Sequence, residues 1–190
     1  MLTGCIFVAM SFASATATAQ SFPVKPVKVV VGYAPGGAVD IVARTVGQSV
    51  AGSLGQAVIV ENKPGAGTNI AVRAVIDAPA DGYTLLLAAN ALAANMALYQ
   101  PAPFDAERDL VPVSLVGRVP VVIASNAQSG LPSLAKLIET AKAKQGQLNY
   151  ATPGNGSTPH LAVELFARAA GIKLSHVPYK GGAPAITDVL

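Results

Sequence analysis

Cysteine, histidine and tryptophan are nearly absent from this chain of 190 residues, which contains one cysteine, two histidines and no tryptophan. Cys5 lies in an apolar N-terminal stretch that we expect to be removed, so the remaining chain can form no disulfide and no cysteine metal site. His160 and His176 are too few to build a histidine metal cluster. These absences predict no metal and no cofactor, and they suit an oxidising compartment.

Charged residues make up only 12% of the sequence, and the formal net charge is +3. The basic residues are scattered and do not alternate with aromatic residues, so we expect no nucleic-acid partner. The sequence shows no paired carboxylates suited to acid–base catalysis. A mildly basic chain without acidic tracts is compatible with a small anionic ligand.

The first twenty residues, MLTGCIFVAMSFASATATAQ, form an uncharged apolar stretch that ends in small residues. Ala17-Thr18-Ala19 fits the pattern of signal peptidase cleavage, which predicts a signal peptide over residues 1–19 and an exported mature chain. The apolar part is too short for a membrane-spanning helix, which needs ~20 residues. Leu2-Thr3-Gly4-Cys5 resembles a lipoprotein cleavage box but precedes the apolar run instead of following it. We therefore favour export as a soluble protein.

Short apolar strands alternate with amphipathic helices along the rest of the sequence. Pro26–Tyr33 (PVKVVVGY) is rich in valine, as expected for a central parallel strand that is covered on both faces. Ser114–Ser125 contains Pro120 in mid-run, which favours an extended connection between two lobes over a central strand. The alternation predicts an α/β fold with doubly wound parallel sheets, in which residues 20–120 form a first lobe and residues 121–190 a second.

The helix after the first strand carries an apolar residue every four positions, and we expect this stripe to face the sheet. Its members are Val42, Val46, Val50 and Leu54. The last predicted helix, Ala183–Leu190, reaches the end of the sequence without a glycine, polar tail or cap. Helices normally end at such a signal, so we expect a C-terminally truncated chain with an incomplete second lobe.

Two segments carry a glycine turn between a strand and a helix. The first is VGYAPGGAVDIVAR, residues 31–44, and the second is TPGNGSTPH, residues 152–160. Such a turn leaves backbone N–H groups pointing outward at a helix N-terminus, where they can bind an anion. Ligands of doubly wound sheets lie beyond the carboxyl ends of the strands, where both turns are expected. Two turns facing one cleft would hold a small anion from both sides.

Nucleotide-binding motifs do not explain these turns. Gly32 and Gly37 have P-loop spacing, but Ala38-Val39 replaces the Lys-Ser/Thr pair that contacts phosphate and magnesium. Gly65-Ala66-Gly67 begins like a dinucleotide fingerprint, but Ile70 replaces the third glycine. An ordinary strand-to-helix connection is the remaining alternative.

Several polar residues lie beside the turns, and most of them allow more than one interpretation. Asp40 would stabilise the dipole of its helix, or bond an amide of its own loop or a ligand ammonium. Asn90 follows the third strand as a polar contact or a helix cap, and Thr158 can cap the helix of the second turn. His160 is either a packing or hydrogen-bonding residue, or a ligand contact.

Signals for an enzyme are weak. Ser157 and His160 lie three positions apart, which leaves an exported α/β hydrolase using Ser157 as the competing function. However, Gly154-Asn155-Gly156-Ser157 is not the Gly-x-Ser-x-Gly turn of such hydrolases. We therefore expect a binding protein and no enzymatic activity.

Five motifs follow one another along the chain: FPVKPVKVVVGYAPGGAVDIVAR, VENKPGAG, ADGYTLLLA, LNYATPGNGSTPHLAVELF and HVPYKGGAPAITDVL. In this order and spacing they resemble the Bug family, the periplasmic solute receptors of tripartite tricarboxylate transporters. The resemblance implies a two-lobed Venus-flytrap receptor for a small carboxylate, namely a di- or tricarboxylate, an amino acid or an aromatic acid. It also implies a periplasmic monomer that serves uptake or sensing, with membrane subunits of the transporter as partners.

The resemblance further implies ligand contacts at both glycine turns, largely through backbone amides and bridging water. The candidate ligand-binding residues, with Asn90 added for its place after the third strand, are Tyr33, Ala34, Pro35, Gly36, Gly37, Asp40, Asn90, Thr152, Gly156, Ser157 and His160. Relatives often have further glycines where this chain has Thr68-Asn69-Ile70-Ala71. The family continues beyond the length of this chain, which agrees with the expected truncation.

Overall fold

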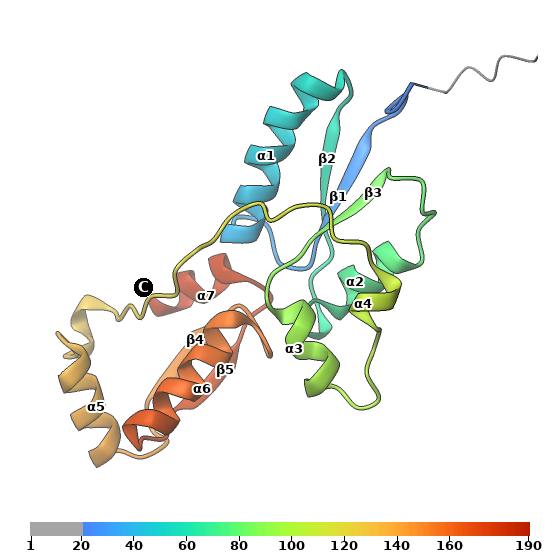
Figure 1. The fold of residues 1–190 in the computed structure, drawn as a ribbon. Helices are drawn as coiled ribbons and strands as arrows, with labels where there is room; N and C mark the ends of the chain where they lie inside the picture. Colours follow the sequence, from blue (N-terminus) through green and yellow to red (C-terminus); the bar gives the residue numbers. More distant parts are fainter. Residues whose placement is uncertain (1–20) are drawn as a thin grey trace, which may run out of the picture.

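The computed structural model describes residues 21–190 and contains two separate parallel sheets with helices beside them (Figure 1). In the first sheet, β1 (Val27–Val31) lies between β2 (Val58–Asn62) and β3 (Thr84–Leu87). The second sheet consists of β4 (Asn149–Thr152) and β5 (Ser175–Pro178). All the paired strands are parallel, which confirms the predicted α/β class.

Helices connect the strands, as parallel pairing requires. They are α1 (Ala38–Leu54), α2 (Asn69–Ile76), α3 (Ala91–Leu98), α4 (Ala106–Asp109), α5 (Leu134–Ala143), α6 (Thr158–Ala170) and α7 (Gly182–Val189), with short 3-10 turns η1 (Ala66–Thr68) and η2 (Ala127–Ser129). Within residues 21–190, none of these helices has the length and apolar character needed to span a membrane. The signal peptide predicted over residues 1–19 lies outside the described residues.

β1 is the central strand of the first sheet, and its valines are buried because strands pair with it on both sides. Val30 and Val31 are fully buried. Val31 pairs with Asn62 of β2 and Leu87 of β3. The residues that follow β1 therefore emerge in the middle of the carboxyl edge of this sheet.

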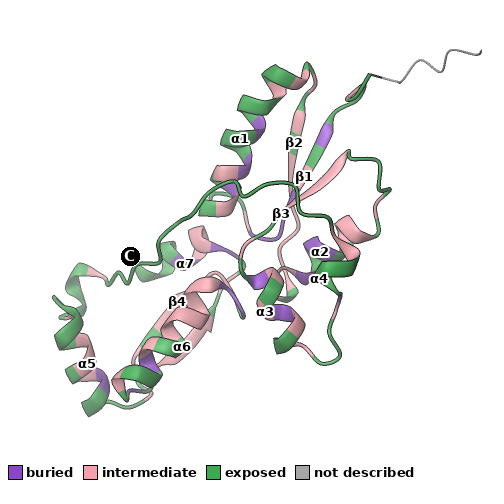
Figure 2. Cartoon of the chain, in the orientation of Figure 1, coloured by how far each residue is buried: buried purple, intermediate pink, exposed green. Residues whose placement is uncertain are grey.

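The apolar stripe predicted on α1 is wrong at two of its four positions, whereas Val42 and Leu54 are half-buried. Val46 and Val50 are exposed, whereas Ala43 and Gly47 are buried on the side that packs on the sheet (Figure 2). A Cβ atom on Gly47 would lie 3.0 Å from Cγ1 of Val58. Small residues face the sheet because α1 lies too close to β2 for larger side chains.

The second sheet has an apolar core of its own. Ala141 of α5, Ala167 of α6 and Ile172 form a buried cluster beside it. Residues 110–126 run from the first sheet to this unit as an extended segment without regular secondary structure (Figure 1). The segment is extended, as Pro120 indicated, and its apolar side chains are exposed, including Val113.

The two sheets approach each other through backbone contacts. Ala34 N donates a hydrogen bond to Lys180 O at 2.7 Å. A Cβ atom on Gly181 would lie 2.9 Å from Ala34 N, and one on Gly37 would lie 3.4 Å from Gly182 N. The N-termini of α1 and α7 therefore meet where the chain carries only glycines and the methyl groups of alanines.

Candidate functional site

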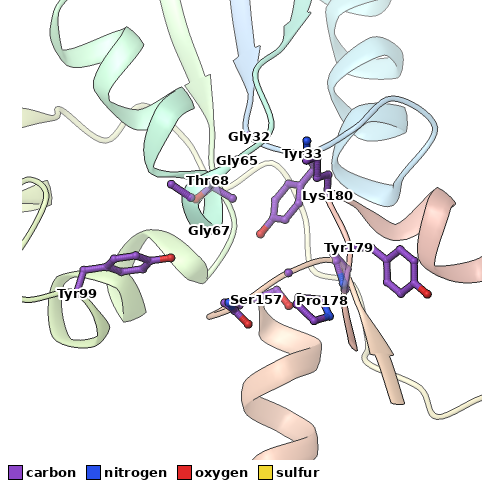
Figure 3. A pocket seen from close by; sticks show the side chains of 14 residues that line it. Gly32, Tyr33, Gly65, Gly67, Thr68, Tyr99, Ser157, Pro178, Tyr179 and Lys180 are labelled. Atoms are coloured by element: carbon purple, nitrogen blue, oxygen red, sulfur yellow. The ribbon is translucent and has the colours of Figure 1, made fainter. Parts of the chain in front are cut away.

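A cavity of about 240 Å³ lies between the carboxyl ends of the two sheets (Figure 3). The loops after β1, β2, β4 and β5 form its walls, together with Tyr99 from the end of α3. The lining residues are Gly32, Tyr33, Gly65, Ala66, Gly67, Thr68, Tyr99, Pro153, Gly154, Asn155, Ser157, Pro178, Tyr179 and Lys180. Among these described residues none is acidic, and most are glycines or carry a hydroxyl group. The walls therefore suit an anion held by neutral donors, with Lys180 as the one cation among these lining residues.

Asp40 holds the loop after β1 in place through hydrogen bonds. Gly36 N donates to Asp40 Oδ2 at 2.9 Å, and Asn62 Nδ2 donates to Asp40 Oδ1 at 2.8 Å. Asn62 Nδ2 also donates to Tyr33 O at 3.0 Å. Arg44 adds two N–H groups to the same carboxylate, at 2.9 and 3.0 Å. Asp40 thus bonds an amide of its own loop, which was one of its three predicted roles.

The electrostatics of this loop follow from these bonds. The pKa of Asp40 is lowered from 3.8 to about 2, chiefly by the hydrogen bond from Arg44 and also by the bonds from Gly36 and Asn62. Burial acts in the opposite direction. Burial raises the pKa of Tyr33, so its hydroxyl stays protonated and can donate a hydrogen bond at neutral pH. The Tyr33 ring points into the space between Gly67 and Ser157 (Figure 3).

The loop after β2 forms a left-handed turn. Gly65, Ala66, Gly67 and Thr68 all have positive φ angles, of 134°, 47°, 63° and 83°. Ala66 and Thr68 carry side chains, and such residues in this region cost about 1 kcal/mol or more each. Strained backbone of this kind clusters at functional sites.

Asn95 of α3 holds this left-handed turn in place. Its side chain is fully buried, and Nδ2 donates to Gly67 O and to Asn69 Oδ1, both at 2.6 Å. Its Oδ1 has no partner within the described residues. A Cβ atom on Gly156 would lie 2.7 Å from that oxygen, so Asn95 touches the loops of both sheets.

The loop after β4 is shaped by two glycines and closed by Ser157. Gly154 and Gly156 have φ angles of 137° and 72°, which a side chain would strain. Ser157 Oγ accepts a hydrogen bond from His160 N at 3.4 Å and caps α6. The predicted cap Thr158 is wrong, because Thr158 is already the first residue of the helix.

The predicted site residues fall into three groups in the structure. Tyr33 and Ser157 line the cavity. A second group supports the lining loops without lining the cavity itself: Ala34, Gly37, Asp40, Thr152, Gly156 and His160. Pro35, Gly36 and Asn90 are exposed and lie outside the cavity lining.

The sequence analysis missed three contributors to the cavity, namely the turn Gly65–Thr68, Tyr99 and the segment Pro178–Lys180. The two segments follow β2 and β5, so the rule that placed the glycine turns at the carboxyl edge of a parallel sheet would have found them. Tyr99 follows a helix, and no pattern in the sequence indicates where its ring lies.

The geometry does not favour the hydrolase alternative. His160 Nδ1 accepts a hydrogen bond from Gly156 N at 3.1 Å, and its Nε2 lies 3.9 Å from Glu164 Oε1. Both ring nitrogens are therefore directed at groups other than the hydroxyl of Ser157. Within residues 21–190, no group of three acidic, histidine or cysteine residues is arranged to hold a metal ion.

Comparisons with known proteins agree with this geometry. The model of the tripartite tricarboxylate transporter family receptor matches residues 42–190. Protein BugT of Bordetella pertussis is 40% identical over 187 residues, which cover 97% of this chain and 57% of BugT. The chain thus spans a little over half the length of this relative.

Two solved structures are similar to the chain. The structure of R. palustris Rpa4515 with adipate has a TM-score of 0.85 and 34% identity, over 88% of this chain and 56% of that one. The periplasmic binding protein BugD has a TM-score of 0.78 and 34% identity, over the same shares of the two chains. These neighbours carry the same arrangement of parallel sheets over most of the described residues.

Proposed function

Because this chain belongs to the tripartite tricarboxylate transporter receptor family, we propose that it binds a small carboxylate in the cavity between its two sheets. The membership confirms the resemblance indicated by the five motifs. The similar protein Rpa4515 was solved with adipate, a dicarboxylate, which supports this class of ligand. The similarity to the periplasmic protein BugD supports export to the periplasm.

The single observation that carries the proposal is the composition of the cavity wall. Loops from the carboxyl ends of four parallel strands enclose about 240 Å³, and their described lining residues include no acidic group. Hydroxyl groups of Tyr33, Tyr99 and Ser157 border this space. These neutral donors are fixed by the surrounding fold, and Lys180, the cation of the lining, is exposed, so a carboxylate can bind without a buried counter-charge that would itself need desolvation.

We further propose a division of labour between two lobes, residues 20–120 and 121–190, that close on the ligand. Each lobe provides one glycine loop, and closure is driven by the higher affinity of the closed form. Membrane subunits of a transporter would then receive the ligand, or a sensing partner would recognise the closed form. In either case the chain holds its ligand and does not transform it.

Calorimetry tests this proposal with one member of each ligand class: adipate, citrate, glutamate and benzoate. We expect heat of binding from at least one of them, saturable at one ligand per chain, with the ligand recovered unchanged by NMR. Asn90→Ala is the matched control, because Asn90 is exposed and lies outside the cavity lining, so its affinity should equal that of the parent. No binding to any of the four, or conversion of a bound ligand, would overturn the proposal.

A further inference from the structure

Two histidine rings lie stacked behind the loop that follows β4. The ring centroids of His160 on α6 and His176 on β5 are 4.1 Å apart, with an interplanar angle of 17°. Tyr150 of β4 also stacks on His176, at 4.9 Å. Three elements of the second sheet unit thus bring together rings that the binding role does not by itself require.

His160 is bonded directly to the loop that lines the cavity. Gly156 N donates to His160 Nδ1 at 3.1 Å. An N–H donor can approach this nitrogen only if it carries no proton, so the ring is neutral with its proton on Nε2. Gly156 sits at a φ of +72° between the lining residues Asn155 and Ser157. The bond to His160 therefore fixes the conformation of the cavity wall.

The charged and titratable groups around the pair come from α6, β4 and β5. Glu164 Oε1 lies 3.9 Å from His160 Nε2 and accepts a hydrogen bond from the Tyr150 hydroxyl. His176 Nε2 lies 2.6 Å from Thr152 Oγ1. Burial lowers the pKa of His176, His160 lowers it further, and Glu164 acts in the opposite direction. The two rings resist being charged at the same time because like charges in stacked contact repel.

We propose that His160 is a positioning residue whose neutral ring holds Gly156 and the cavity wall, and whose protonation releases them and weakens carboxylate binding. Protonation adds a hydrogen to Nδ1, which then faces the Gly156 N–H instead of accepting from it. The loop must move by enough to separate two donors. This inference rests on the proposed function, since its consequence for affinity requires that the cavity binds a carboxylate.

An imidazolium at His160 would also attract an anionic ligand, and this attraction alone would raise the affinity on acidification. His160 does not line the cavity, and Glu164 Oε1 lies 3.9 Å from its Nε2, so this carboxylate offsets a positive charge on the ring. His160 lies in the first turn of α6, where a positive charge is unfavourable with the helix dipole. The lost contact therefore dominates, and affinity falls on acidification.

Two variants at this position separate the hydrogen bond from the charge. In His160→Asn the side-chain oxygen can replace Nδ1 as the acceptor and does not titrate, whereas His160→Phe keeps a stacking ring without an acceptor. We expect the parent to bind adipate about fivefold more weakly at about pH 5 than at about pH 8, after correction for ligand protonation measured with His160→Asn. His160→Phe should bind about fivefold more weakly at both pH values. A His160→Asn profile identical to that of the parent, or parent-like binding by His160→Phe, would overturn the proposal.

An NMR measurement without ligand tests the positioning role of His160 separately from the proposed carboxylate binding. In the 15N-labelled chain, we expect the amide resonance of Gly156 to shift along the titration curve of the His160 ring nitrogens, and its hydrogen exchange to accelerate on the acid side. Failure of all carboxylates to bind would defeat the proposed function while this titration still reports on the switch. If the chemical shift of the Gly156 amide does not follow the protonation of the His160 ring, the positioning role is refuted whether or not a carboxylate binds.

Discussion

The carboxylate of Asp40 provides the sharpest test of how the first cavity loop is held. We consider Asp40→Asn, which keeps the size of the side chain and one oxygen for Gly36 N but removes the charge. The new amide nitrogen would face the N–H groups of Arg44 and Asn62, which now donate to the carboxylate. The variant therefore loses an ion pair and leaves donors opposed to each other.

The expected magnitude follows from the pKa of Asp40, which is lowered from 3.8 to about 2. A carboxyl group shifted this far contributes about 2.5 kcal/mol of stability at neutral pH. Arg44 is half exposed, so solvent screening reduces the expected value to about 2 kcal/mol. Because the folded pKa is the lower one, this stability is present above about pH 4 and is lost as the pH falls toward about 2.

Urea unfolding followed by far-UV circular dichroism measures this difference between parent and variant from about pH 7 to about pH 2. Asp77→Asn is the matched control, because Asp77 forms an i,i+4 pair with Arg73 in which both side chains are at least half exposed. We expect the control to lose less than about 0.5 kcal/mol at any pH. The reasoning would be refuted if Asp40→Asn lost no more free energy of unfolding than the control. It would also be refuted if the loss in Asp40→Asn stayed constant down to about pH 2.

Three further predictions concern the cavity walls. Gly36→Val should abolish carboxylate binding by calorimetry while the circular dichroism spectrum is retained, because φ at Gly36 is +81°; unchanged affinity would contradict this. Asn95→Leu should lower the free energy of unfolding by about 2 kcal/mol, since Gly67 O and Asn69 Oδ1 lose their donor, and a change below about 0.5 kcal/mol would argue against that role. Tyr99→Phe should weaken binding up to about tenfold with stability unaltered, and an equal affinity would remove its hydroxyl from the site.

The glycine loops could be predicted from the sequence because their position follows from parallel sheet geometry. Val30 and Val31 identify the central strand, and the residues after it must emerge at the carboxyl edge. This reasoning places the loop after β1 at the edge where the cavity lies, and the family resemblance added Tyr33, which lines the cavity in the structure. The same rule places Gly65–Thr68 at this edge, because the segment follows β2, although it contains no nucleotide motif.

Features that depend on close packing could not be predicted from the pattern of hydrophobic residues. Hydrophobicity alone assigned Val46 and Val50 to the sheet side of α1, whereas the short distance to Val58 requires Gly47 there. The same limit applies to Tyr99, whose place in the cavity depends on how α3 packs on η1. Side chains brought together by tertiary contacts leave no periodic trace in the sequence.

The contact between the N-termini of α1 and α7 also bears on the motions of the molecule. Gly37 and Gly182 meet there without side chains, and Gly181 lies against the backbone of Ala34. Interlocked side chains would have to change rotamer before one unit could turn against the other, but the glycines and alanines at this contact have no rotamers to change. A rotation about this point would therefore require little side-chain repacking. Collective domain movements of this kind occur on the microsecond-to-millisecond scale. Bulky substitutions at Gly181 would therefore hinder the closure of the two lobes that we propose.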